Sequence, residues 1–162
     1  MSKEQTKHDL LLFGNCFERG YETMNREGYT YSDFLEDLRK RQIPLYTDLI
    51  KTLGPKISGI VDPEKVKYFY AKNAFKEGEK NIFFFCIDKL FHVKVVERSV
   101  TFRTIKRPIV EASLSSNPES LSTVLSIEFD NGERIDFDSL ADSDSNWNSE
   151  YSATLEYIYK SV

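Results

Sequence analysis

The stretch that most constrains the fold of this chain is residues 123–137, which read T-V-L-S-I-E-F-D-N-G-E-R-I-D-F. Apolar and polar residues alternate on both sides of the D-N-G triplet, as in a β-hairpin with one buried face. A two-residue Asn-Gly loop would set core residues opposite charged ones. A three-residue loop, with Gly132 left-handed in a bulge, instead pairs Ile127 with Ile135 and Leu125 with Phe137. The sequence therefore predicts the three-residue loop.

More strands are predicted before this hairpin, and one helix after it. Apolar or alternating runs indicate strands at residues 66–70, 82–87, 91–96, 100–105 and 109–114. Beyond the hairpin, apolar residues at helical spacing indicate an amphipathic helix along Trp147, Tyr151, Leu155, Ile158 and Val162. Asn148 is its expected N-cap. We expect this helix to cover the apolar face of the hairpin.

In the first third of the chain, apolar residues recur at the spacing of α-helices. Three short helices are predicted there: one along an apolar stripe in residues 8–25, one N-capped by Ser32, and one that starts at Pro44 and ends at Gly54-Pro55. We therefore expect an α+β protein. A helical segment, residues 1–55, should pack on a strongly bent antiparallel sheet formed by residues 56–162, which the C-terminal helix caps, in one compact unit.

The order of strands and final helix resembles the pleckstrin-homology-like (PH-like) barrel, in particular its short bacterial forms. I-D-K-L-F-H-V at 87–93 looks like the family's tight second turn, T-D-K-R-L, and the strand I-V-E-A-S-L at 109–114, the hairpin and the last helix follow in the family's order. Ile87 stands where the family usually has Thr. The resemblance covers about residues 65–162 and implies a barrel in an uncharacterised bacterial family. Many PH-like domains bind phosphoinositides or peptides.

Charge is distributed unevenly along the chain. Residues 63–110 carry a net charge of +6 and residues 111–162 a net charge of −9. The two segments either form a basic and an acidic face or lie side by side and neutralise each other. Arg and Lys side chains bind phosphate groups, so the expected anion site consists of Lys94, Arg98, Arg103, Lys106 and Arg107.

An acidic loop mimics the start of a calcium-binding EF-hand. The candidate metal ligands are Asp142, Asp144 and Glu150, but the sixth loop position is Trp147 rather than Gly and the twelfth is Ala153 rather than Glu. Acidic residues are also favoured where a helix begins. We therefore expect a solvated loop, with no metal and no other cofactor.

Signals for catalysis are weak. His92, one of two histidines, points to the strand face opposite Phe91 and Val93 and fits an ordinary strand residue. No nucleophile elbow, H-E-x-x-H or P-loop motif occurs in the sequence. The prediction is a protein that is not an enzyme, with a hydrolase or metal-dependent enzyme as the third-ranked alternative.

A non-catalytic binding or adaptor module is the leading functional prediction, acting on another protein or through self-association. Edge strands of an open barrel favour this mode because they can pair with an added strand. The alternative is binding of an anionic phospholipid surface or phosphate at the five cations; nucleic acid is not expected. Cys16 and Cys86 lack disulfide or metal spacing and the N-terminus lacks a signal-peptide pattern, which predicts a cytoplasmic protein.

Overall fold

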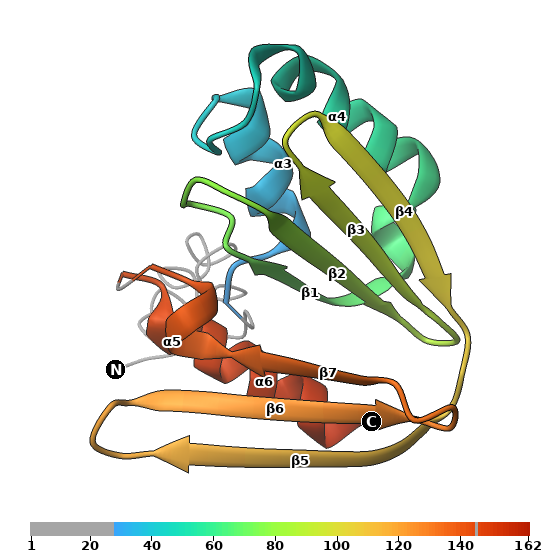
Figure 1. The fold of residues 1–162 in the computed structure, drawn as a ribbon, viewed down its shortest axis with the longest axis vertical. Coiled ribbons are helices and arrows are strands. Elements are labelled where there is room, and N and C mark those ends of the chain that lie inside the picture. The colour runs from blue at the N-terminus through green and yellow to red at the C-terminus, as the bar shows by residue number, and fades with distance from the viewer. Residues whose placement is uncertain (1–27, 145) are drawn as a thin grey trace, which may run out of the picture.

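Two antiparallel sheets organise the chain in a computed structural model that describes residues 28–144 and 146–162 (Figure 1). The strand orders are β1-β2-β3-β4 and β5-β6-β7. The strands are β1 (Val66–Lys72), β2 (Lys80–Cys86), β3 (Leu90–Val96), β4 (Ser99–Ile105), β5 (Ile109–Asn117), β6 (Ser122–Phe129) and β7 (Arg134–Asp138). The predicted α+β class is confirmed, and the two sheets do not close into one continuous barrel.

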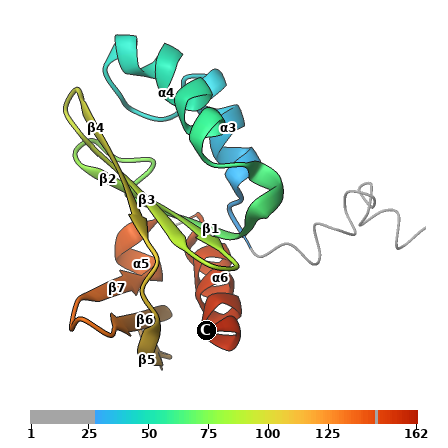
Figure 2. The ribbon, with the colours of Figure 1, turned by 90° about the vertical axis from the view of Figure 1, so that its right-hand side faces the viewer.

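Helices flank both sheets. They are α3 (Tyr31–Arg39), α4 (Thr47–Ile60), the 3-10 turn η1 (Pro63–Lys65), α5 (Ser139–Asp142) and α6 (Asn148–Ser161). Figure 2 shows α3 and α4 along one face of the four-stranded sheet and α6 beside the three-stranded sheet. The helix predicted in residues 8–25 lies outside the described residues.

The four-stranded sheet is the middle layer of the core, and both its faces are aromatic. On one face, Phe69 and Phe84 contact the ring of Tyr31 in α3, with centroid distances of 5.8 and 4.8 Å. On the other face, Phe83 meets Phe137 of β7 edge to face at 5.0 Å. Because side chains alternate across a strand, the consecutive residues Phe83 and Phe84 of β2 face opposite sides of the sheet, one toward β7 and the other toward α3.

The predicted hairpin is present as β6 and β7. Its register is the predicted one, with the pairs Ile127–Ile135 and Leu125–Phe137. Gly132 has φ of +89°, and its N–H donates to the Phe129 carbonyl at 2.9 Å. This is the left-handed bulge that the hydrophobic pattern requires. Helix α6 packs against β6 on the inner face of the hairpin, as expected.

A Gly132→Val variant should lose about 1–3 kcal/mol of unfolding free energy, because a β-branched residue is strained at positive φ. No atom lies within 4 Å of an added Cβ, so the loss is conformational rather than steric. Urea denaturation measures it. Gly59→Ala, in α4 and equally open to solvent, is the control and should be neutral or gain up to about 1 kcal/mol. Equal stability of Gly132→Val and wild type would contradict the bulge.

Helix α3 begins at Tyr31, two residues earlier than the expected Ser32 cap allows. Thr30 is the N-cap: its hydroxyl accepts from the Asp33 N–H at 3.1 Å, and the Asp33 carboxylate accepts from the Thr30 N–H at 2.9 Å. This capping box needs an acidic or amide side chain three residues after the cap. Ser32 would place Leu35 at that position, so the prediction of Ser32 was wrong.

Helix α4 starts and ends later than predicted. It begins at Thr47 rather than Pro44 and continues through Gly54-Pro55 to Ile60. Pro55 is exposed, so water can hydrogen-bond the carbonyl that loses its helical partner. Leu53 and Ile57 are buried on the opposite side and hold the helix onto the core. This burial outweighs the local signal of Gly54-Pro55.

The expected N-cap of α6 is also displaced by one residue, from Asn148 to Trp147. The Asn148 side chain instead bonds outside the helix. Its oxygen accepts from the Ser139 hydroxyl at 2.8 Å and its amide donates to the Leu121 carbonyl at 2.9 Å. Asn148 therefore fastens α5 and the β5–β6 turn to the start of α6.

Candidate functional site

Two of the five predicted anion-binding residues lie near the β1–β2 and β3–β4 connections, and each faces a carboxylate. Lys94 in β3 lies 3.0 Å from the carboxylate of Glu79. Arg98, in the β3–β4 turn, lies 3.7 Å from Asp48 and stacks over Tyr46 of the loop before α4, at 4.6 Å. Both cations are half-exposed or more, so these pairs contribute little stability.

The other three predicted residues follow β4 toward its end. Arg103 forms a bidentate salt bridge with Glu133, with nitrogen–oxygen distances of 2.6 and 2.7 Å. The Arg107 guanidinium lies 3.0 Å from the Asp130 carboxylate. Lys106 forms no ion pair with a described residue. A seven-residue strand spans roughly 20 Å, so Arg98 and Arg107 stand at opposite ends of β4. The structure therefore divides the five cations and gathers only Lys106 and Arg107.

The turn between β2 and β3 adds a different kind of residue to this pair. We call Ile87-Asp88 the β2–β3 tip; it is closed by the Cys86 N–H, which donates to the Lys89 carbonyl at 2.9 Å. Ile87 is 93% exposed, the highest value among the exposed large hydrophobic side chains of the described residues. A single exposed isoleucine is common on protein surfaces, so its neighbours decide what it signifies.

A pocket of about 610 Å³ opens beside the tip; we call it the basic pocket. Its lining includes four buried apolar side chains, Phe85, Leu90, Ile105 and Phe129. Its charged lining side chains are four cations, Lys67, Lys89, Lys106 and Arg107, and one carboxylate, Asp88. The pocket thus combines an apolar floor with a cationic rim. Such a combination suits an amphiphile with an anionic head.

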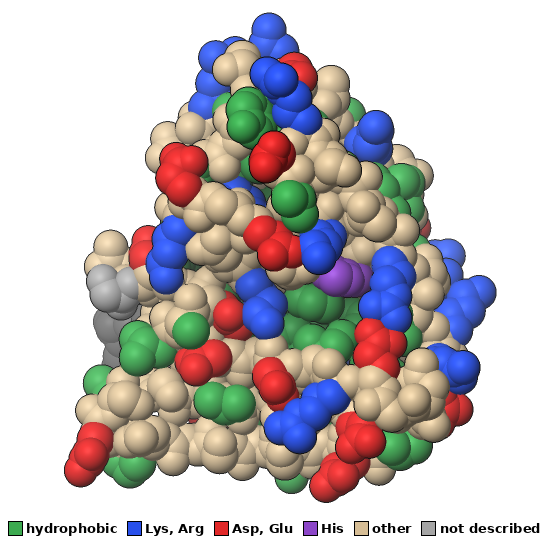
Figure 3. Space-filling view, in the orientation of Figure 1, with side chains coloured by type: hydrophobic (Ala, Val, Ile, Leu, Met, Phe, Trp, Pro, Cys, Tyr) green, Lys and Arg blue, Asp and Glu red, His purple; other side chains and the backbone are tan. Residues whose placement is uncertain are grey.

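The cations are visible from outside the molecule. Figure 3 shows Lys and Arg side chains gathered at the edge where the β2–β3 tip and the β4–β5 connection lie in Figure 1. The other flank of the tip is mixed in charge. There a pocket of about 850 Å³ is lined by Asp62 and Glu64 as well as Lys65. The excess of positive charge is therefore on the side of the basic pocket.

A second feature is a hollow between the two sheets. Figure 3 shows hydrophobic side chains on its floor and a histidine at its edge. His92 stacks on Phe83 at 4.5 Å, and its Nε2 lies 2.8 Å from Asn81 Oδ1. Burial, followed by the charges of Arg103, Lys94 and Lys72, lowers the pKa of His92 to about 4. At physiological pH, His92 is therefore neutral.

The depressed pKa of His92 predicts acid sensitivity. The unfolded chain binds more protons than the folded one between about pH 4 and 6.5, so stability should fall as pH falls through that window. The loss should approach about 2–3 kcal/mol at the acid end. Urea denaturation of wild type and His92→Gln across this range measures it as a difference. A difference that does not change with pH would contradict the assignment, and the NMR titration of the His92 ring provides a direct check.

The three candidate metal ligands do not form a site. Asp142 is buried and accepts from the Tyr70 hydroxyl at 2.9 Å and the Asp138 N–H at 2.7 Å. Burial raises the pKa of its carboxyl group. Asp144 accepts from the Asn146 N–H, which shapes the turn before α6. Among the described residues, no group of three or more potential metal-binding side chains is gathered.

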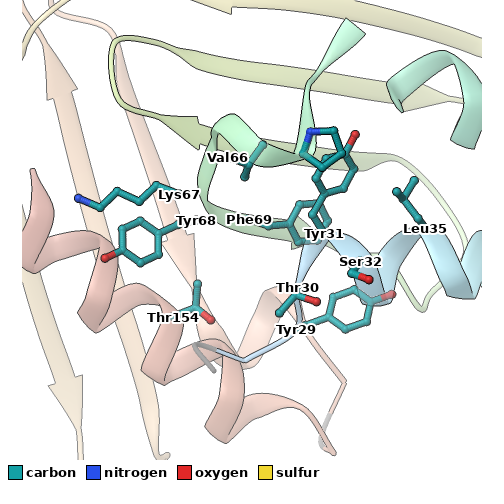
Figure 4. Close-up of a pocket in the computed structure, with 11 residues that line it drawn as sticks. Tyr29, Thr30, Tyr31, Ser32, Leu35, Val66, Lys67, Tyr68, Phe69 and Thr154 are labelled. Atoms are coloured by element: carbon teal, nitrogen blue, oxygen red, sulfur yellow. The ribbon is translucent and has the colours of Figure 1, made fainter. Parts of the chain in front are cut away.

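An apolar pocket of about 450 Å³ lies between α3, the start of β1 and α6 (Figure 4). Tyr31, Phe69 and Leu35 line one side, Lys67 and Tyr68 the other, and Thr154 of α6 lies between them (Figure 4). Gly28, the first described residue, comes directly before the lining residue Tyr29. This apolar pocket carries one charged side chain, Lys67, and therefore lacks the cationic character of the basic pocket.

The described chain is thus a two-sheet α+β protein with the β2–β3 tip and the basic pocket at one end of its first sheet. Residues 30–153 match the family described as "Protein of unknown function (DUF3908)". The match spans more than half of the chain, which therefore belongs to the DUF3908 family, an uncharacterised one as expected. No curated protein and no solved structure matches the chain. None of the described helices has the length and apolar character needed to cross a membrane.

The residues that sequence reasoning missed are Ile87, Lys67 and Lys89. The predicted strand 82–87 placed Ile87 inside the sheet, whereas the turn begins at this residue. Lys67 and Lys89 join Lys106 because the start of β1, the β2–β3 turn and the end of β4 meet at one end of an antiparallel sheet. The order of the predicted strands implies this meeting point if neighbouring strands are antiparallel. The count of charges along the sequence does not.

Proposed function

We propose that this protein is a non-catalytic, PH-like binding module that docks on anionic phospholipid membranes through the β2–β3 tip. The observation that carries the proposal is Ile87, exposed at the apex of the tip beside a pocket with four cations and one carboxylate. Four-stranded and three-stranded antiparallel sheets followed by a C-terminal helix support the PH-like part. The proposed location is the cytoplasmic face of a membrane.

The tip combines the two interactions that hold peripheral proteins on membranes. Each Lys or Arg near an anionic surface contributes about 1 kcal/mol, and burying one isoleucine side chain contributes about 1.5–3 kcal/mol. Lys89 and Lys106 form no ion pair with a described residue, whereas Arg107 is shared with Asp130. Ile87 would enter the acyl boundary while Lys89 and Lys106 reach the lipid phosphates. The resulting attachment is reversible and sensitive to salt.

The basic pocket provides a shaped binding site for a lipid headgroup, in addition to a positively charged surface. A phosphate at the rim could accept hydrogen bonds from Lys106 and from Arg107 if Arg107 exchanges Asp130 for the ligand. The exchange involves an exposed ion pair and therefore has a low free-energy cost. Phe85 and Leu90 then contact the apolar part of the lipid.

Vesicle co-sedimentation tests the proposal. The protein should bind phosphatidylcholine vesicles only when they contain phosphatidylglycerol, and the binding should fall as salt rises. Lys106→Glu should weaken partitioning by about 10- to 30-fold, because two units of charge change at the surface, and Ile87→Asp by about 100-fold. Inorganic phosphate is the soluble probe: competition by phosphate alone would indicate a site for the free anion.

Matched variants separate the tip from general charge and hydrophobicity. Lys51→Glu makes the same charge change on α4, away from the basic pocket, and should bind vesicles like wild type. Leu121→Asp replaces another exposed hydrophobic side chain in the β5–β6 turn and should also bind normally. If all four variants bind equally, or if vesicles without phosphatidylglycerol bind as well, the proposal is wrong.

A further inference from the structure

Strand β5 presents an unpaired edge of unusual character. It is nine residues long, and among the described residues it pairs only with β6. Most of its side chains are exposed, and Glu111 is its one charged residue. Natural edge strands are usually shortened, charged or interrupted by proline, because an open row of N–H and C=O groups pairs with any other strand. Apart from the bulge between Ile109 and Glu111 and the single charge of Glu111, β5 carries none of these protections.

Two of the other edge strands, β7 and β4, differ from β5. Strand β7 has five residues, and Lys72 of β1 donates to a backbone carbonyl of β7 at 2.6 Å. Strand β4 is tied to the β6–β7 turn through the two bonds between Arg103 and Glu133. Both contacts link an edge strand of one sheet to the other sheet. Figure 1 shows β5 at the outer border of the molecule, with β6 on its inner side.

We propose that two copies of this chain pair through β5, antiparallel and in register about Leu114, to form a continuous six-stranded sheet. The segment 111–117 follows the bulge and is symmetric about Leu114. Pairing it with itself sets Glu111 opposite Asn117 and Ser113 opposite Ser115, so no like charges face each other. The half-buried Leu114 meets its own copy on the apolar face. Seven residue pairs provide about six to eight backbone hydrogen bonds.

This interface is independent of the membrane proposal, since it uses residues 111–117 of β5 and none of the cations that line the basic pocket. The partner is a second copy rather than a foreign segment because the self-paired register sets no like charges opposite each other and matches side chains of similar size. The two copies of α6 then lie on the same side of the joined sheet, as a two-fold axis normal to the sheet requires.

Charge-swapped variants test both the interface and its register. Variant one carries Ser113→Lys and Ser115→Lys, and variant two carries Ser113→Glu and Ser115→Glu. Each pair sets like charges opposite each other in a self-dimer, whereas a one-to-one mixture sets opposite charges together. Both serines are exposed, which favours retention of the fold. Thermal unfolding checks this, and Thr101→Lys with Thr104→Lys on β4 is the control.

Sedimentation equilibrium of the full chain should show a monomer–dimer equilibrium for wild type and for the β4 control. The dissociation constant of each β5 variant should rise by at least tenfold, and the mixture should recover a heterodimer. A wild type that stays monomeric at all concentrations overturns the proposal and leaves the edge to a segment of another protein. Dimers that persist in the β5 variants, or a mixture that does not recover them, also overturn it.

Discussion

A Tyr151→Ala variant is expected to lose about 3–5 kcal/mol of unfolding free energy, the range for truncating a large buried aromatic side chain. Tyr151 in α6 is 1% exposed. Its ring packs edge to face on Tyr70 at 4.9 Å, and its hydroxyl donates to the Ala71 carbonyl at 2.7 Å. Both partners belong to β1. Tyr151 therefore links the C-terminal helix to the four-stranded sheet, and we expect its removal to weaken the packing between the two sheets.

Tyr151→Phe separates packing from the hydrogen bond. It keeps the ring and removes the donor, which leaves the Ala71 carbonyl without this partner in a buried site, so we expect a loss of about 1–3 kcal/mol. Burial raises the pKa of the Tyr151 hydroxyl well above its usual value, so the hydroxyl stays a donor at all ordinary pH values. Urea denaturation of both variants measures the contributions of ring packing and of the hydrogen bond to the unfolding free energy. Loss of less than about 1 kcal/mol in Tyr151→Ala would contradict this role.

The second large effect is expected at Lys80, the first residue of β2, which is 1% exposed. Its ammonium group donates to the Asn73 carbonyl at 3.1 Å and also to the Lys76 carbonyl. The connection between β1 and β2 thus wraps around one cation. Lys80→Ala removes both donors and the buried stem, and we expect a loss of about 3–4 kcal/mol.

Lys80→Met is the matched control because it keeps most of the apolar stem. It should lose about 2 kcal/mol, the part due to the unpaired carbonyls. Hydrogen exchange adds a local readout, since amides of the β1–β2 connection, residues 73–79, should lose protection before those of the strands. Equal stability of Lys80→Ala and Lys80→Met would mean that the stem contributes nothing, and wild-type stability of both would refute the described contacts.

Local patterns in the sequence predicted the parts of the fold that depend on near neighbours. The β6–β7 register follows from two alternating runs and a glycine that tolerates positive φ. The apolar stripe of α6 follows from residue spacing, and Tyr151, Leu155 and Ile158 are indeed buried. In each case, the residues that decide the structure lie within about fifteen positions of each other.

The parts that failed depend on contacts distant in sequence. Helix α4 continues past Pro55 because the core buries Leu53 and Ile57. The five predicted cations looked like one site, but they are spread along β3 and β4 and the turns at both ends of the four-stranded sheet. Ile87 resembled its apolar neighbours in β2, and only the closure of the turn by Cys86 and Lys89 exposes it.

The most direct measurement of membrane docking is a fluorescent label at the tip. A variant with Ile87→Cys, and with Cys16→Ser and Cys86→Ser to remove the native thiols, carries an environment-sensitive dye at residue 87. Its emission should shift to the blue and strengthen when vesicles with phosphatidylglycerol are added at low salt, and should stay unchanged with phosphatidylcholine alone. The same dye at Leu121→Cys should not respond. An unchanged spectrum at residue 87, or an equal response at residue 121, would contradict the account.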